Sequence, residues 1–257
     1  MKQVKKVSIG GLILFLVFSS CMKDSNHSST STQLNLSNTN LQRGEPLIVS
    51  TALPENNPLI RWSIYPSTGT TIMQAKTKAV AFFGLSGSYA INVHYYSGSD
   101  TTHAYDSSSA RIVVNDSIYT NPPPDNNLDS VSLGDDEITL VPISASDSGL
   151  VMMAKTTKLY NCVSYLTAHS WTPFGPGLDV DFNGAEVVEG TGDCQGAQNP
   201  AISYLIFGSF SPGTYDINVH LNRVDYHGAL TVTNTSYSFN WNYSSGVIIS
   251  PTTVRKQ

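Results

Sequence analysis

The chain has 257 residues and a formal net charge of −5, from 14 basic and 19 acidic side chains. This balance leaves no basic surface for nucleic acid, so that class of partner is excluded. Only 13% of residues are charged, while Ser, Thr, Asn, Gly and Tyr abound. This composition favours a secreted, β-rich protein with room for two ordinary domains.

Residues 1–20 have the three parts of an export signal. A lysine-rich start is followed by an apolar run from Val7 to Phe18, which is too short to cross a bilayer. Two serines then precede Cys21. Small residues followed by cysteine resemble the lipobox of bacterial lipoproteins, which implies cleavage before Cys21 and a diacylglycerol on its thiol. The alternative is an ordinary secretory signal with a chance cysteine.

The residues after the cysteine indicate a location. Cys21-Met22-Lys23-Asp24 resembles the surface-export signal of Bacteroidota lipoproteins. The resemblance implies a protein anchored to membrane lipid at the outer membrane and exposed at the cell surface, with a periplasm-facing lipoprotein as the alternative. Residues 21–33 offer almost nothing to bury, so we expect a flexible tether.

Residues 34–116 show short apolar runs with turn signals between them, which predict an antiparallel β-sandwich. The predicted strands are 34–36, 46–52, 59–65, 70–75, 78–83, 88–96 and 110–115. Trp62 lies in the third of these, and Gly87-Ser88-Tyr89-Ala90-Ile91-Asn92-Val93 opens the sixth. A core tryptophan and a corner tyrosine at these places resemble Ig-like and PKD domains of bacterial surface proteins.

Three prolines, Pro122 to Pro124, predict a stiff linker over residues 117–130. We place a domain boundary there. The second domain, 131–257, is expected to be a further β-sandwich, and strands are predicted at 162–169, 178–182, 185–189, 201–209, 214–221, 229–233, 236–243 and 246–249. Asn183-Gly184 between two alternating runs predicts a hairpin.

One segment of each half repeats. Residues 87–94 read Gly-Ser-Tyr-Ala-Ile-Asn-Val-His, and residues 213–220 read Gly-Thr-Tyr-Asp-Ile-Asn-Val-His. The repeat predicts the same late-strand corner in both sandwiches.

Cys162 and Cys194 remain once Cys21 carries lipid. In an oxidising compartment they predict a disulfide, with buried free thiols as the alternative. The bond would close a loop of roughly 33 residues and stabilise the fold by about 3–4 kcal/mol.

Two motifs allow both a structural and a functional interpretation. Asp179, Asp181 and Asn183-Gly184 begin like a calcium loop, but the acidic residue expected at its twelfth position is absent, so the hairpin is preferred and no metal is expected. The alternating row Tyr237, Phe239, Trp241 and Tyr243 is interpreted as core, with an exposed sugar-binding platform as the alternative.

The aromatic, turn-rich segment 165–177 is the predicted ligand site, with Tyr165, His169 and Trp171 as its residues. No motif pairs a nucleophile with a base, so we expect no enzyme and no cofactor. The sequence therefore predicts two tandem sandwiches that capture a glycan at the cell surface, with the first as spacer. The alternative is protein adhesion or a structural envelope role. Exposure of Trp171 or Trp241 would favour the glycan, and burial the alternative.

Overall fold

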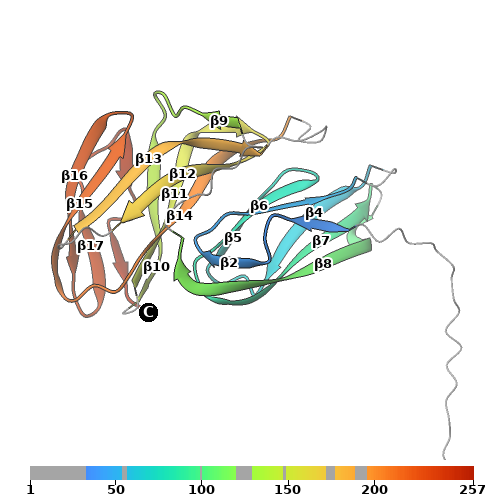
Figure 1. Ribbon diagram of the computed structural model, residues 1–257, viewed down its shortest axis with the longest axis horizontal. Helices are drawn as coiled ribbons and strands as arrows, with labels where there is room; N and C mark the ends of the chain where they lie inside the picture. The colour runs from blue at the N-terminus through green and yellow to red at the C-terminus, as the bar shows by residue number, and fades with distance from the viewer. Residues whose placement is uncertain are drawn as a thin grey trace, which may run out of the picture. The chain divides into compact units, whose positions relative to one another are not determined.

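The computed structural model describes residues 33–53, 57–98, 100–119, 129–146, 149–171, 177–188 and 196–257; for 129, 130 and 169–171 it describes the backbone alone. These residues belong to one compact unit, Ser31–Gln257. They form nineteen strands and no helix, which confirms the all-β prediction (Figure 1). Within these ranges no helix is long and apolar enough to cross a membrane. The signal, Cys21, most of the tether and residues 120–128 of the linker lie outside the described residues.

The first half is a sandwich of two four-stranded sheets. One sheet has the order β1 (Leu34–Leu36), β3 (Leu47–Thr51), β6 (Lys78–Phe83) and β5 (Thr70–Gln74). The other has the order β2 (Asn40–Arg43), β8 (Asp100–Ile118), β7 (Gly87–Ser97) and β4 (Leu59–Tyr65). Alternate residues of β4 point inward, and Trp62 is a core residue, as predicted.

The second half is one eleven-stranded sheet. Its strands are β9 (Asp129–Val131), β10 (Ile138–Ser146), β11 (Gly149–Asn161), β12 (Val163–Trp171), β13 (Gly177–Val188), β14 (Gln198–Phe207), β15 (Gly213–Leu221), β16 (Val224–Val232), β17 (Ser236–Asn240), β18 (Val247–Ile249) and β19 (Thr253–Arg255). The order is β18-β10-β11-β14-β12-β13-β15-β16-β17-β19, with β9 beside β13. The prediction of antiparallel sheets needs correction at four pairings, β2–β8, β10–β18, β12–β14 and β13–β15, which are parallel.

This sheet folds over a single core, so strands from its two ends meet across it. Side chains of β10 and β17 belong to the same buried cluster. The Tyr237 hydroxyl of β17 donates to the carbonyl of Ser146 on β10 at 2.9 Å, and Trp241 Nε1 donates to the Val247 carbonyl at 2.9 Å. The result is a sandwich made from one continuous sheet.

The prediction of a hairpin at Asn183-Gly184 is wrong, because the single strand β13 runs through both residues. Thr167 of β12 lies opposite Gly184 and Ala168 lies opposite Phe182, so Asn183 is the extra residue of a β-bulge. Val180 and Phe182 point into the core before the bulge, and Ala185 and Val187 do so after it. The bulge therefore moves the inward-facing positions from even to odd residue numbers. A turn between two alternating strands would produce the same sequence pattern, which is why the sequence predicted a hairpin here.

The repeated octapeptide forms the same corner twice. Tyr89 donates its hydroxyl proton to the Leu85 carbonyl at 2.9 Å, and Tyr215 donates to the Ser211 carbonyl at 2.7 Å. Each bond reaches back four residues to the chain before the strand, the geometry of a tyrosine corner. The corner predicted from the repeat is therefore confirmed in both halves.

The two halves meet in a third hydrophobic cluster, which we call the junction cluster. It consists of Met73, Ala75, Val80, Phe82, Val151, Cys162, Val163, Tyr165, Val188, Ile202, Tyr204 and Ile206. The rings of Phe82 and Tyr204 stack with centroids 5.5 Å apart. Strands β6 and β14 are buried on both faces, because each serves its own core and the junction cluster. The domain boundary at 117–130 stays a prediction.

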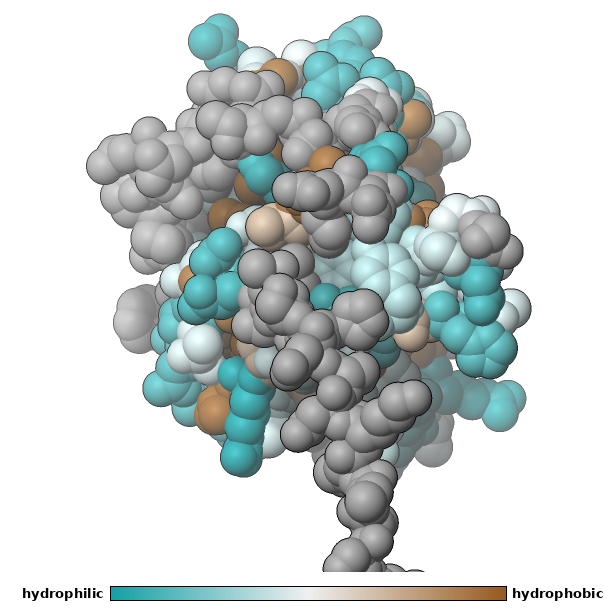
Figure 2. All heavy atoms as spheres, turned by 90° about the vertical axis from the view of Figure 1, so that its right-hand side faces the viewer, coloured by the Kyte–Doolittle hydropathy of each residue, from teal (hydrophilic) through white to brown (hydrophobic). Residues whose placement is uncertain are grey.

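Exposed large hydrophobic residues are dispersed among the described strands. Tyr65 on β4, Tyr105 on β8 and Leu159 on β11 are each more than half exposed. Figure 2 shows one face, on which the coloured hydrophobic residues lie among hydrophilic ones. Scattered apolar side chains of this kind are normal on a monomer surface.

Candidate functional site

A set of polar side chains lies on the side of β13, β15 and β16 opposite the core. Core residues alternate with them: Leu178 and Val180 on β13, and Ile217 and Val219 on β15, are buried. Alternate strand residues face opposite sides of a sheet. We call the outward set the polar face, and it consists of Asp179, Asp181, Asn218, His220, Asp225 and His227.

The first row of the polar face crosses three strands. Asn218 lies opposite Asp179 on β13 and opposite His227 on β16. Its amide nitrogen donates to Asp179 Oδ1 at 2.9 Å, and its amide oxygen is 2.8 Å from His227 Nδ1. A carboxylate only accepts, which fixes the orientation of the amide. The amide oxygen must then accept from His227, so the Nδ1 atom of this ring carries a proton.

The second row runs beside the first, two residues away from it on each of the three strands. His220 lies opposite Asp181 on β13 and Asp225 on β16. Its Nδ1 is 2.7 Å from Asp225 Oδ1, and its Nε2 is 4.0 Å from Asp181 Oδ1. The hydrogen bond to Asp225 raises the pKa of His220 above its ordinary value; burial opposes this rise, and the Asp181 charge adds to it. The row therefore favours a protonated imidazole between two carboxylates.

Strand β12 extends both rows by register. Trp171 pairs with Asp179, and His169 pairs with Asp181. The side chains of His169 and Trp171 lie outside the described residues. The backbone of two of the three predicted ligand residues therefore lies next to the strand that carries Asp179 and Asp181, and it lies in a strand instead of the predicted loop.

Tyr165 does not join them. It is 5% exposed, belongs to the junction cluster and lies opposite Glu186. It therefore offers no open surface to a ligand. The remainder of the predicted loop, residues 172–176, lies outside the described residues.

Most of the aromatic row in the C-terminal region belongs to the core, as the preferred interpretation of the sequence predicts. Tyr237, Phe239 and Trp241 are buried at 0%, 5% and 7% exposure, whereas Tyr243 is 37% exposed. Gly228 lies directly over Trp241, since a Cβ there would come within 2.5 Å of the indole. The row provides no aromatic platform for a sugar.

The acidic triplet 135–137 is structural. Asp136 is 4% exposed, and its carboxylate accepts from the Tyr160 hydroxyl at 2.9 Å and from the backbone nitrogen of Lys158 at 2.9 Å. Burial and this carboxylate raise the pKa of Tyr160. Glu137 accepts from the backbone nitrogen of Gly246 at 3.2 Å. These acids hold the start of β10 in place.

Asp179 and Asp181 lie in a strand, so the calcium loop that their spacing suggests does not form. Among the described residues, no group of three or more His, Cys, Asp or Glu side chains is arranged to hold a metal ion. Cys194 lies outside those residues, so its bond to the buried Cys162 stays a prediction.

Sequence reasoning did not identify Asn218, His220, Asp225 and His227 as a group. A signal was present, because Asn218 and His220 alternate along β15 with the buried residues Ile217, Val219 and Leu221. Their partners on β13, Asp179 and Asp181, could not be predicted from such an alternation. Strands β13 and β15 are parallel and separated by β14 in the chain, and a crossover of that kind leaves no local pattern.

The architecture defines an all-β protein of the sandwich class. No family model and no curated protein matches the chain. Among solved structures, it is similar to the fibronectin(III)-like modules of CbhA from Clostridium thermocellum, with 7% identity and a TM-score of 0.24 over 87% of this chain and 93% of that chain. A likeness of this degree carries no functional argument.

Proposed function

We propose that the protein is a lipid-anchored, non-catalytic lipoprotein of the outer membrane that captures a glycan at the cell surface. The single observation that carries the binding role is the polar face, with its two rows continued by register to His169 and Trp171. The anchoring role rests on Cys21 and the signal before it. The first sandwich is the spacer.

The chemistry of the rows suits a polyhydroxylated ligand. A sugar hydroxyl both donates and accepts hydrogen bonds, and carboxylate, amide and imidazole groups provide both capacities in planar arrangements. Each row already holds its own side chains by hydrogen bonds, such as Asn218 to Asp179 and His220 to Asp225. Side chains that are oriented in advance lose less entropy when a ligand binds.

The charge of the polar face limits the ligand class. Three carboxylates, Asp179, Asp181 and Asp225, lie within two adjacent rows. Their field repels uronic-acid and sulfated polysaccharides. Neutral glycans and those carrying amino groups are therefore the preferred ligands.

Affinity electrophoresis in gels containing neutral polysaccharides tests this proposal. Trp171→Ala and Asp181→Ala should each remove retention while leaving the melting temperature nearly unchanged. Tyr65→Ala is the matched control, because Tyr65 is an aromatic residue of the first sandwich that is 75% exposed. If Trp171→Ala costs about 3–5 kcal/mol of stability, this residue is core and the binding role is overturned.

Lipid anchoring has a separate test. Wild-type protein should partition into the detergent phase, and Cys21→Ala should release it. Protease treatment of intact cells then separates the two membrane faces, since surface-exposed protein is digested and periplasm-facing protein is not. A Cys21→Ala variant that partitions like wild type would refute the anchor.

Protein adhesion or a structural envelope role is the second candidate, and the burial of Trp241 at 7% exposure favours it. Of the two tryptophans that would support sugar stacking if exposed, this one is core. Absence of retention on every neutral and amino polysaccharide, together with crosslinking to a second surface protein, would select this alternative.

A further inference from the structure

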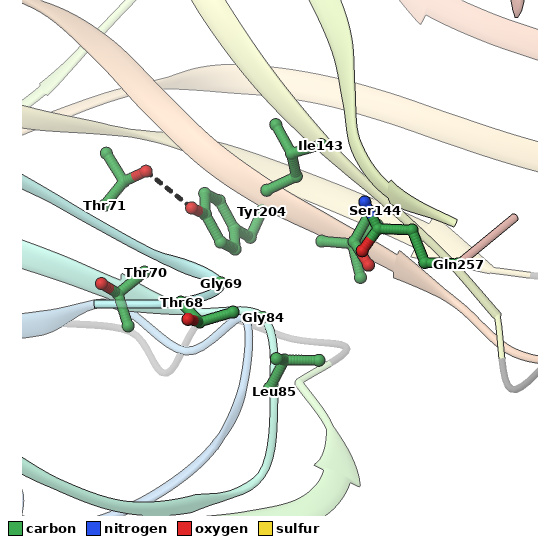
Figure 3. A pocket seen from close by; sticks show the side chains of 11 residues that line it. Thr68, Gly69, Thr70, Thr71, Gly84, Leu85, Ile143, Ser144, Tyr204 and Gln257 are labelled. Carbon is green, nitrogen blue, oxygen red and sulfur yellow. Dashed lines mark hydrogen bonds between the residues drawn. The ribbon is translucent and has the colours of Figure 1, made fainter. Parts of the chain in front are cut away.

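A cleft of about 330 Å³ lies between the two halves of the compact unit. The first half contributes the β4–β5 turn, the start of β5 and the β6–β7 turn, and the second half contributes β10, β11, β14 and Gln257 (Figure 3). The junction cluster lies beside it, because Tyr204 and Val151 belong to both. Clefts between packed domains are common places for small ligands.

The lining is uncharged in its side chains but rich in hydroxyl groups. Thr68, Thr70, Thr71, Ser144 and Tyr204 carry the hydroxyls, and Leu85, Ile143 and Val151 provide apolar surface. Leu85 and Ile143 come from opposite halves and are 38% and 36% exposed. Among the described residues that line the cleft there is no lysine, arginine, histidine, aspartate or glutamate.

One hydroxyl pair leaves capacity for a ligand. Thr71 Oγ1 and the Tyr204 hydroxyl are 2.6 Å apart, and either can donate (Figure 3). The pair has two protons and this bond uses one of them. The pKa of Tyr204 is raised by burial, with the bond to Thr71 opposing the rise. The phenol therefore stays protonated and neutral at physiological pH.

The walls are held rigidly. Tyr204 is fixed by its stack on Phe82 and its bond to Thr71. Gly84 donates its backbone N–H to the Gly69 carbonyl at 2.8 Å, and a Cβ on Gly69 would come within 2.9 Å of Leu85. Gly69 also has φ +67°, which glycine adopts without strain. A preformed cleft avoids the ordering cost of ligand binding.

We propose that this cleft binds a single uncharged polyhydroxylated ring, such as a neutral monosaccharide or a cyclic polyol. Hydroxyl groups of the lining match hydroxyl groups of the ring, and Leu85 and Ile143 contact its C–H face. Carboxylates and phosphates would lose their hydration without gaining a cationic partner among the side chains that line the cleft. The volume is at the lower end of the range for ligand sites, which suits one ring. This site is separate from the polar face and does not rest on it.

Saturation-transfer NMR on the purified protein tests the proposal, with glucose, galactose, mannose, N-acetylglucosamine and myo-inositol as probes. At least one should bind, while glucuronate should not. Ser144→Leu fills the cleft and should weaken binding by about tenfold or more. Ile143→Ser, which removes apolar surface from the rim, should weaken binding too. Leu159→Ser is the matched control, since this residue is 56% exposed, lies outside the cleft lining and should leave binding unchanged.

The outcomes separate the cleft from the polar face. Asn218→Ala should leave binding of the monosaccharide unchanged. If no neutral probe binds, if glucuronate binds as well as glucose, or if Ser144→Leu keeps wild-type affinity at an unchanged melting temperature, the proposal is overturned. Loss of binding in Asn218→Ala with wild-type affinity in Ser144→Leu would assign the ring to the polar face instead.

Discussion

Strands β7 and β15 make an internal comparison, because the same octapeptide pattern gives the same local structure in two different surroundings. Both carry the tyrosine corner, and both bury their Ile and Val. Both turn an Asn and a His outward, Asn92 and His94 in β7 and Asn218 and His220 in β15.

The neighbours differ. His94 lies opposite Arg61 and Ser107, and Asn92 lies opposite Ser63 and Ser109. In β15 the same positions are opposite Asp181, Asp225, Asp179 and His227. A strand pattern therefore fixes which side chains face outward, and the adjacent strands decide what those side chains do.

The largest expected effect concerns the inward residues. Ile91→Ala and Ile217→Ala should each cost about 2–5 kcal/mol of unfolding free energy, because both side chains are buried and leave a cavity. Urea denaturation measures both. Conservative Ile→Val changes at the same positions serve as controls and should cost about 0.5–1.5 kcal/mol. A cost under about 1 kcal/mol for either alanine variant would break the equivalence of the two strands in their cores.

Substitutions of the outward-facing residues should have different effects on glycan binding in β15 and β7. Asn218→Ala and His220→Ala should weaken glycan binding by about 1–3 kcal/mol, since each leaves polar partners in its row unsatisfied. The matched variants Asn92→Ala and His94→Ala should leave binding unchanged. Isothermal titration with the retained polysaccharide measures all four. Equal losses in both pairs would show that the surroundings do not matter.

The corner tyrosines should have a smaller effect. Tyr89→Phe and Tyr215→Phe each remove one hydroxyl hydrogen bond and should cost about 1 kcal/mol of stability. Tyr89 is 5% exposed and Tyr215 is half-buried, so the first should cost more. Thermal unfolding measures the difference. A larger cost at Tyr215 would contradict this order.

The smallest effect is a pH dependence. The Asp225 hydrogen bond raises the folded-state pKa of His220, so its protonated form stabilises the fold below about pH 6.5 and this contribution is lost as pH rises through the raised pKa. NMR titration of the imidazole measures the pKa directly. In urea unfolding, His220→Gln should remove that part of the pH profile, whereas His94→Gln should not. A midpoint at or below that of a free histidine would contradict the prediction.

Much of the first half could be predicted because its strands alternate. The predicted strands 34–36, 59–65 and 78–83 match β1, β4 and β6 at both ends. Strand β2 was missed because Asn40–Arg43 contains a single apolar residue, Leu41. Strands β10 and β11 were also missed. The apolar run from Leu140 to Ile143, which includes Pro142, obscures the alternation of β10, and the first half of β11 is buried on both faces, so neither sequence shows a period of two.

The contact between the two halves also had a signal in the sequence, which is different from the alternation that predicts a strand with one buried face. Residues 79–83 of β6 and 201–207 of β14 are buried at every position. A continuous apolar strand in an otherwise alternating protein predicts burial on both faces. The assembly of the polar face had no equivalent signal, because Asp179, Asn218 and His227 are brought together only by the order of the strands in the sheet.

The bulge at Asn183 has a consequence for insertions and deletions. Strand β13 contains one residue more than regular alternation needs, so Asp179 and Asp181 remain outward on one side of the bulge while Val188 faces the junction cluster on the other. Loss of Asn183 would restore an ordinary strand without turning any of these side chains over, whereas loss of Phe182 would leave the core without that ring. A central strand, normally the part of a protein least tolerant of a change in length, here has one position at which descendants could shorten the chain and keep both surfaces.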